Sequence, residues 1–186
     1  MCIADHMNLR EFGGMVDFAK SLGVDRISFL AADVLSDAFH RDYAGLVAER
    51  AEIMLNEDET REFRNIIKEF ISKYQAEIEN RFISESPEKL FHLVQYFEAL
   101  AGTAPFPRNV CNSPMVSAVI SSTGDLLPCF FLPAFGNIRS APLQQEMNNA
   151  RIRSARRRVR EYSLTRCHEC VCTLYVNPLA ALMDRF

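Results

Sequence analysis

The sequence has no long apolar segment. No stretch of its 186 residues approaches the roughly 20 consecutive apolar residues that a membrane-spanning helix needs. Its first residues, Met1 to His6, also lack the basic and apolar regions that are typical of a signal peptide. We therefore expect a cytoplasmic protein that makes no use of a membrane.

The sequence also lacks a strong excess of positive charge. It has 21 Lys and Arg against 24 Asp and Glu, and this net charge of −3 argues against a dedicated nucleic-acid binder. The charges are unevenly spread: residues 139–186 hold 9 basic and 4 acidic residues (+5), which leaves 12 and 20 (−8) elsewhere. Six of those arginines lie between Arg151 and Arg160, where we expect a helix with a solvated face; anion binding is the alternative.

Internal repeats and low-complexity segments are absent, and 48% of the residues are hydrophobic. This composition excludes wholesale disorder and fibrous classes. The length predicts one domain, or one domain with a piece of another, and it is sufficient for a core without disulfide bonds.

Cysteines are scarce before residue 111 and clustered after it. Cys2 stands alone, while Cys111, Cys129, Cys167, Cys170 and Cys172 follow. Because the cytosol keeps thiols reduced, we expect no disulfide framework. Clustered reduced cysteines indicate a metal site instead.

The first forty residues have the pattern of a helix followed by a strand. Apolar residues recur at helical spacing from Leu9 to Leu22, Gly23 is placed to end the helix, and residues 26–30 predict a strand. This is half of a parallel α/β repeat, for which no upstream strand is evident. A lone parallel strand is unstable, so we expect either a longer protein or a second chain that completes the sheet.

Further along, the pattern predicts helices over 42–55, from about 58 to 78, and over 87–100, with apolar faces that form a core. After residue 103, prolines and glycines exclude long helices. Alternating Val116, Ala118 and Ile120, a turn at 121–125 and the apolar Leu126–Leu127 predict a β-hairpin.

Cys111 and Cys129 bracket this hairpin, and Cys167 and Cys170 form a Cys-x-x-Cys pair. Together they provide four thiolates, which suit either a tetrahedral zinc ion or a four-iron cluster. The ligand count leaves both open. A thioredoxin-like redox role is disfavoured because the pair lacks a strand-then-helix setting.

Residues 107–175 resemble a known family. Cys111-x12-Gly124-x4-Cys129, the segment Phe135 to Arg139 and Cys167-x2-Cys170 are similar to the SPASM/Twitch auxiliary-cluster domain of radical S-adenosylmethionine (SAM) enzymes. Leu22 to Leu30 resembles the last helix–strand step of the partial barrel in these enzymes. The resemblance implies an iron–sulfur protein that takes part in radical modification of a peptide, tetrapyrrole or small metabolite.

The pattern is closer to the shorter Twitch form, which implies one 4Fe–4S cluster held by Cys111, Cys129, Cys167 and Cys170. Cys172 departs from the family spacing and either replaces Cys170 or is a bystander. His168, between the last ligands, is expected to face solvent.

The Cys-x3-Cys-x2-Cys motif that binds the catalytic cluster of the family is absent. We therefore expect this chain to be inactive alone, with SAM and a second 4Fe–4S cluster present only in a full-length enzyme. Its partner is expected to be a missing N-terminal barrel or a separate catalytic chain. The alternatives are a structural zinc module held by the same four cysteines and a stand-alone electron-transfer protein.

The expected fold class is α+β. Residues 1–40 are predicted to be the end of a partial α/β barrel, with one helix–strand unit, and residues 41–106 a helical connector. Residues 107–186 are predicted to form a small cysteine-rich β-hairpin domain with a C-terminal helix.

Overall fold

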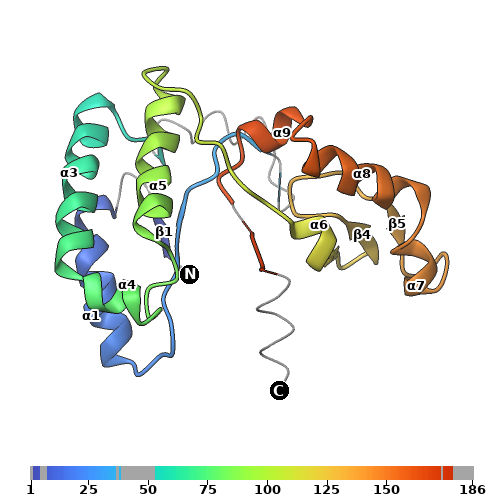
Figure 1. Ribbon diagram of the computed structural model, residues 1–186, viewed down its shortest axis with the longest axis horizontal. Helices are drawn as coiled ribbons and strands as arrows, with labels where there is room; N and C mark the ends of the chain where they lie inside the picture. The colour runs from blue at the N-terminus through green and yellow to red at the C-terminus, as the bar shows by residue number, and fades with distance from the viewer. Residues whose placement is uncertain (1, 5–7, 37, 39–52, 173, 178–186) are drawn as a thin grey trace. The chain divides into compact units, whose positions relative to one another are not determined.

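The computed structural model describes residues 2–4, 8–36, 38, 53–172 and 174–177 (Figure 1). The chain divides into two compact units, the first made of Met1–Leu35 and Asp42–Pro107 and the second of Ser36–Arg41 and Arg108–Phe186. Helices and small sheets are combined, which confirms the α+β class. Among the described residues, no helix combines the length and the apolar character needed to cross a membrane.

The first unit is mostly helical. Its elements are β1 (Cys2–Ala4), the 3-10 helix η1 (Leu9–Glu11), α1 (Phe12–Ser21), β2 (Phe29–Ala31), α3 (Glu57–Lys73), α4 (Gln75–Glu79) and α5 (Pro87–Leu100). Figure 1 shows α3 and α5 side by side. The predicted cap of α5 is present, since the Ser86 side chain accepts a hydrogen bond from the Lys89 amide. The helix predicted over 42–55 falls almost entirely outside the described residues.

The strand near residue 29 is paired, so the prediction of a lone strand is wrong. β1 lies parallel to β2 with Cys2 opposite Phe29, and Ile27 forms a further parallel bridge with Ile83. Strands as short as β1 carry too little alternation to be detected in a sequence. Because β2 is paired, the argument from a lone strand for a longer protein or a second chain no longer applies. That inference rests on the family resemblance alone.

Aromatic rings fill the core of the first unit. Phe12 stacks on Phe29 with ring centroids 4.2 Å apart, and it meets the edges of Phe63 and Phe70 at 5.4 and 5.0 Å. The long helix predicted up to residue 78 is interrupted at Tyr74, which leaves helical geometry (φ −109°, ψ 29°). The Tyr74 hydroxyl instead lies 3.0 Å from the carbonyl oxygen of Gly13 and ties this break to α1.

The second unit combines a small sheet with short helices. Its elements are α6 (Ser113–Val116), β3 (Val119–Ile120), β4 (Asp125–Leu127), β5 (Gly136–Asn137), α7 (Leu143–Glu146), α8 (Ala150–Arg160) and α9 (Thr165–His168). The strands form an antiparallel sheet in the order β3-β4-β5. Val116 lies in α6 rather than in a strand, because Pro114 in the first turn favours a helix there.

Helix α8 covers the core of this unit. Leu126 of β4, Phe135 and Ile152 of α8 are buried together, with Met147 and Ala155 packed against them. Asn149 joins the start of α8 to the segment that contains Phe135. Its side chain accepts a hydrogen bond from the Ile152 amide at 3.0 Å and donates one to the Phe135 carbonyl at 3.0 Å. The predicted helix over 151–160 is present, but only its outer face is solvated.

Gly124, the glycine of the cysteine spacing motif, has a steric reason to be glycine. Its φ is +89°, and a Cβ there would lie 3.1 Å from both Asn137 Oδ1 and Ile138 Cγ1. The turn between β3 and β4 therefore needs both the left-handed backbone and the empty space.

We expect Gly124→Ala to destabilise the metal-free protein by about 1–2 kcal/mol or more, since the left-handed backbone and the contact both disfavour a Cβ. Gly102→Ala is the matched control, because Gly102 has φ +74° with nothing within 4 Å of a Cβ. Urea denaturation should show the larger loss for Gly124→Ala. An equal or smaller loss would contradict the steric argument.

Candidate metal centre

The five cysteines that follow residue 110 line one cavity in the second unit. The cavity has a volume of about 190 Å³, and all five side chains on its wall are half-buried. Cys111 precedes α6, Cys129 follows β4, Cys167 lies in α9, and Cys170 and Cys172 follow that helix. The fold thus brings the four predicted ligands and the doubtful fifth cysteine to one place.

Burial is the main influence on three of these thiols. It is the largest cause of the rise in the pKa of Cys129 to about 11, and the nearby Cys111 and Cys167 contribute to the same rise. Burial also raises the pKa of Cys167 and of Cys170, and Cys111 contributes to both shifts. The thiols of Cys129, Cys167 and Cys170 are therefore protonated at neutral pH without a metal, and a metal that binds them displaces protons.

Cys170 connects the doubtful fifth cysteine, Cys172, to the other cysteines of the cavity. Cys111 raises the pKa of Cys129, Cys167 and Cys170, so these four thiols lie within reach of one another. Cys172 is a partner of Cys170, whose thiol also donates a hydrogen bond to the Cys172 carbonyl at 3.0 Å. Cys172 therefore lies at the Cys170 side of the cavity.

Backbone amides are aimed at two of the sulfur atoms. The amide of Ser113 donates to Cys111 Sγ at 3.4 Å. Amides of Phe131 and Leu132 interact with Cys129 and oppose the rise in its pKa. Such donors stabilise a thiolate, which is the form that binds a metal.

Two asparagines hold the last cysteines against Cys111. The buried Asn109 donates from its side-chain amide to the Cys170 carbonyl. The Asn112 side chain donates to the Val176 carbonyl at 2.7 Å and accepts the Val176 amide at 3.0 Å, as a neighbouring strand would. The Asn112 amide adds a bond to the Leu174 carbonyl at 2.9 Å. We call these contacts the asparagine clasp.

We expect Asn112→Leu to loosen the clasp, because it removes two hydrogen bonds worth about 1 kcal/mol each. Amide hydrogen exchange at residues 174–177 should accelerate, and iron uptake on reconstitution should slow. Asn148→Leu is the control, since the exposed Asn148 side chain bonds only within its own turn, to the Gln144 carbonyl. Unchanged exchange in Asn112→Leu would show that the clasp does not hold this segment.

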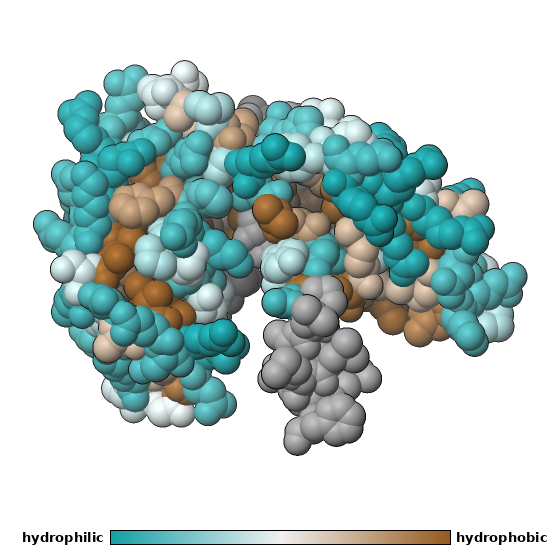
Figure 2. Space-filling view, in the orientation of Figure 1, coloured by the Kyte–Doolittle hydropathy of each residue, from teal (hydrophilic) through white to brown (hydrophobic). Residues whose placement is uncertain are grey.

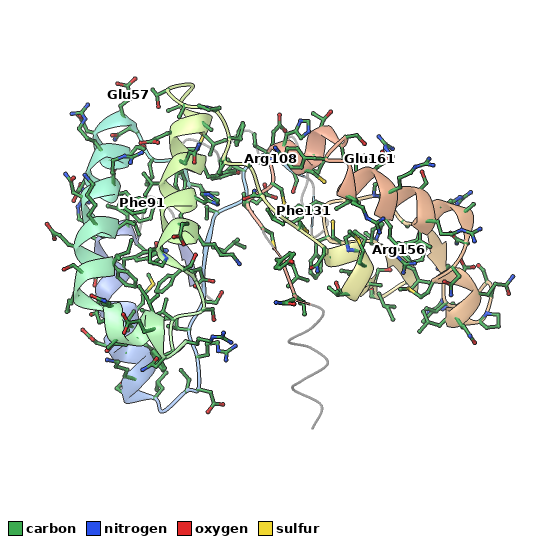
Figure 3. The ribbon with its side chains drawn as sticks, in the orientation of Figure 1. Glu57, Phe91, Arg108, Phe131, Arg156 and Glu161 are labelled. Carbon is green, nitrogen blue, oxygen red and sulfur yellow. The ribbon has the colours of Figure 1, made fainter. Side chains whose placement is uncertain are left out.

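The remaining wall of the cavity is largely apolar. The apolar side chains are Pro114, Val119, Phe130, Phe131, Leu132, Val159 and Leu174 (Phe131 is labelled in Figure 3). Arg166 also lines the cavity, and the Arg158 guanidinium opposes the rise in the pKa of Cys167. An apolar wall with nearby cations suits a thiolate-bound centre of negative charge, because it excludes water while the cations offset the charge.

Other candidate residues have structural roles. His168 is exposed, its ring nitrogen Nε2 lies 2.7 Å from the Tyr162 carbonyl, and it is not part of the cavity wall. Arg156 reaches from α8 to α6, where it donates to the Pro114 carbonyl at 2.8 Å, and it also donates to the Met147 carbonyl at 3.0 Å (Figure 3). Arg156 is thus a packing residue and not part of an anion site.

Four thiolates on one cavity wall suit a single tetrahedral ion or an iron–sulfur cluster, and the two differ in the sulfur spacing that they need. A tetrahedral ion with bonds of about 2.3 Å would require sulfur atoms only about 3.8 Å apart. Among the described residues, no three His, Cys, Asp or Glu side chains have the spacing that one metal ion requires. The cysteines share the wall of a cavity of about 190 Å³ with other, largely apolar residues. A cluster suits this arrangement, because each thiolate then binds a different iron.

Sequence reasoning missed the asparagine clasp and the apolar wall. The signal for the clasp was present in the polar residues that flank Cys111 in the segment Asn109-Val110-Cys111-Asn112. Phe130 and Phe131 directly follow Cys129. The asparagines act through hydrogen bonds to Cys170, Leu174 and Val176, and the phenylalanines share a cavity wall with Val159 of α8. No local sequence pattern indicates these distant partners.

Comparison with known proteins gives one family. Residues 111–171, about a third of the chain, match the SPASM family, described as an iron–sulfur cluster-binding domain. The match confirms the family resemblance over this segment and is consistent with the C-terminal portion of a radical SAM enzyme. Searches among curated proteins and among solved structures gave no match.

Proposed function

We propose that the second unit, whose residues 111–171 match the SPASM domain, binds one 4Fe–4S cluster through Cys111, Cys129, Cys167 and Cys170. The observation that supports this most directly is the meeting of these cysteines, from three separate segments, on the wall of one mostly apolar cavity. Cys172 is a neighbour of Cys170 in this proposal and not a ligand.

The residues around the cysteines prepare the site. Amides of Ser113, Phe131 and Leu132 stabilise the thiolates, and the two phenylalanines after Cys129 add apolar surface to the cavity wall. The asparagine clasp keeps Cys170 within reach of Cys111. A cluster bound there supplies one-electron transfer or a site for substrate.

At the level of the whole protein, we propose that the chain is the C-terminal part of a radical SAM enzyme. The domain type is found in such enzymes, which supports the assignment. The SAM site and the catalytic cluster would then belong to an N-terminal barrel or to a separate catalytic chain. The substrate would be a peptide, a tetrapyrrole or a small metabolite.

Anaerobic reconstitution with iron and sulfide tests the cluster. We expect a brown protein with about four irons and four sulfides per chain. Retention of one zinc per chain through anaerobic purification and iron challenge would overturn the proposal in favour of a structural zinc module. The reconstituted chain, given reductant and SAM, should form no 5′-deoxyadenosine above a protein-free control.

A further inference from the structure

The outer face of α8 is a continuous arginine surface. Its members are Arg151, Arg153, Arg157, Arg158 and Arg160, all exposed, and we call them the α8 arginine face. Figure 2 shows hydrophilic side chains over this helix. Among the described residues no acidic side chain forms an ion pair with any of the five.

The energetics of the helix account for only part of this surface. Arg151 and Arg153 lie at the start of α8, where the positive end of the helix dipole disfavours cations. Arg153 and Arg157 are spaced i, i+4, and like charges at this spacing repel. Arg156, by contrast, is used in packing. The same dipole favours Arg157, Arg158 and Arg160 in the last turn, so the uncompensated cost falls on Arg151 and Arg153, and a bound acidic partner would offset it.

The opposite face of the same helix lines the cysteine cavity. Val159 is buried and lies on the cavity wall, and the exposed Arg158 next to it is still close enough to act electrostatically on Cys167. A helix with its side chains is about 10–12 Å across. A molecule on the arginine face would therefore be separated from the cysteine site by little more than the thickness of α8.

We propose that the α8 arginine face docks an acidic patch of a small one-electron carrier protein, which exchanges electrons with the cluster beneath it. This inference rests on the proposed function. A reduced carrier loses one electron and the oxidised cluster gains it, with no bond made or broken. The face fits a protein patch because its charges lie along one helix of about 16 Å, a length that a compact acidic patch can cover.

Binding of a plant-type ferredoxin with net negative charge tests the docking surface. Calorimetry on the full chain, metal-free and reconstituted, would be run at about 50 mM and about 300 mM salt. Replacing Arg151, Arg153, Arg157 and Arg160 by Gln should weaken binding about tenfold or more at low salt. The variant leaves Arg156 and Arg158 in place, so the packing of α8 and the charge beside Cys167 are kept.

The control is a second four-charge variant, with Arg26, Arg61, Lys68 and Arg81 of the first unit replaced by Gln. These side chains are also exposed, so the change in net charge is the same. The control should bind ferredoxin as the parent does, and its cluster should be reduced by ferredoxin at the parent rate. The α8 variant should take up the same iron but be reduced about tenfold more slowly, with an unchanged rate for dithionite.

Equal ferredoxin binding by the two variants would overturn the docking surface, as would tighter binding of a short DNA duplex than of ferredoxin. Iron analysis keeps the two proposals separate. Ferredoxin binding through these arginines without iron uptake would overturn the proposed cluster and support the docking surface. Normal iron uptake with no ferredoxin binding would support the proposed cluster and overturn the docking surface.

Discussion

Replacing Cys129 by alanine should abolish iron uptake, from about four irons per chain to near zero. Cys129 follows β4, its side chain is half-buried, and Cys111 and Cys167 both act on its thiol electrostatically. Without this thiolate the cluster loses a ligand in an apolar wall that offers few replacements. Iron and sulfide analysis after anaerobic reconstitution measures the effect, and circular dichroism checks that the metal-free variant folds.

Cys172→Ala is the matched control and should keep its iron. Cys172 lines the same cavity and lies beside Cys170, which holds the proposed ligand position. Cys170→Ala tests the remaining alternative, because iron uptake by this variant would mean that Cys172 can replace Cys170. A Cys129→Ala protein with a full complement of iron would contradict the ligand assignment.

Ile152→Ala should have the largest effect on the stability of the second unit, a loss of about 2–5 kcal/mol. The Ile152 side chain is fully buried and packs with Leu126 and Phe135, which make up the core cluster joining α8 to the sheet. A cavity there removes contacts that few other side chains can replace. The control, Ile152→Val, should cost only about 0.5–1.5 kcal/mol.

Hydrogen exchange of the metal-free protein is the suitable measurement, because the chain has no Trp and exchange reports on each unit separately. Amides of β4 and α8 should exchange much faster in Ile152→Ala, while those of α3 and α5 should be unchanged. A loss as small as that of Ile152→Val would show that the core of the second unit lies elsewhere. Iron uptake should fall with stability, since the same core holds Cys129 in place.

Several features could be predicted because their signals are local. The start of α5 follows from Ser86 and Pro87, and its end from Gly102, whose φ is +74°. The spacing of Cys111, Gly124 and Cys129 indicated the family, and the conformation of Gly124 explains why this position must be glycine. In each case a few adjacent residues carry the physical cause.

Other features depended on partners that are distant in the sequence. β1 could not be recognised from three residues, and its pairing with β2 exists only because the chain between them returns in parallel. The break at Tyr74 lies within a stretch of helical periodicity and is associated with a contact to Gly13 in another helix. The strand predicted from Val116 became α6, which α8 contacts through Arg156.

The sequence by itself determined the donor chemistry of this protein: reduced cysteines, their grouping near one hairpin, and the helices that carry clear caps. Only the tertiary structure decided that Cys111 and Cys170 line one cavity, that Asn109 and Asn112 hold them there, and that the arginines of α8 lie on its outer face while Val159 lines that cavity. Residue type and local spacing are properties of the chain, whereas a cavity is made by contacts between segments that only folding brings together.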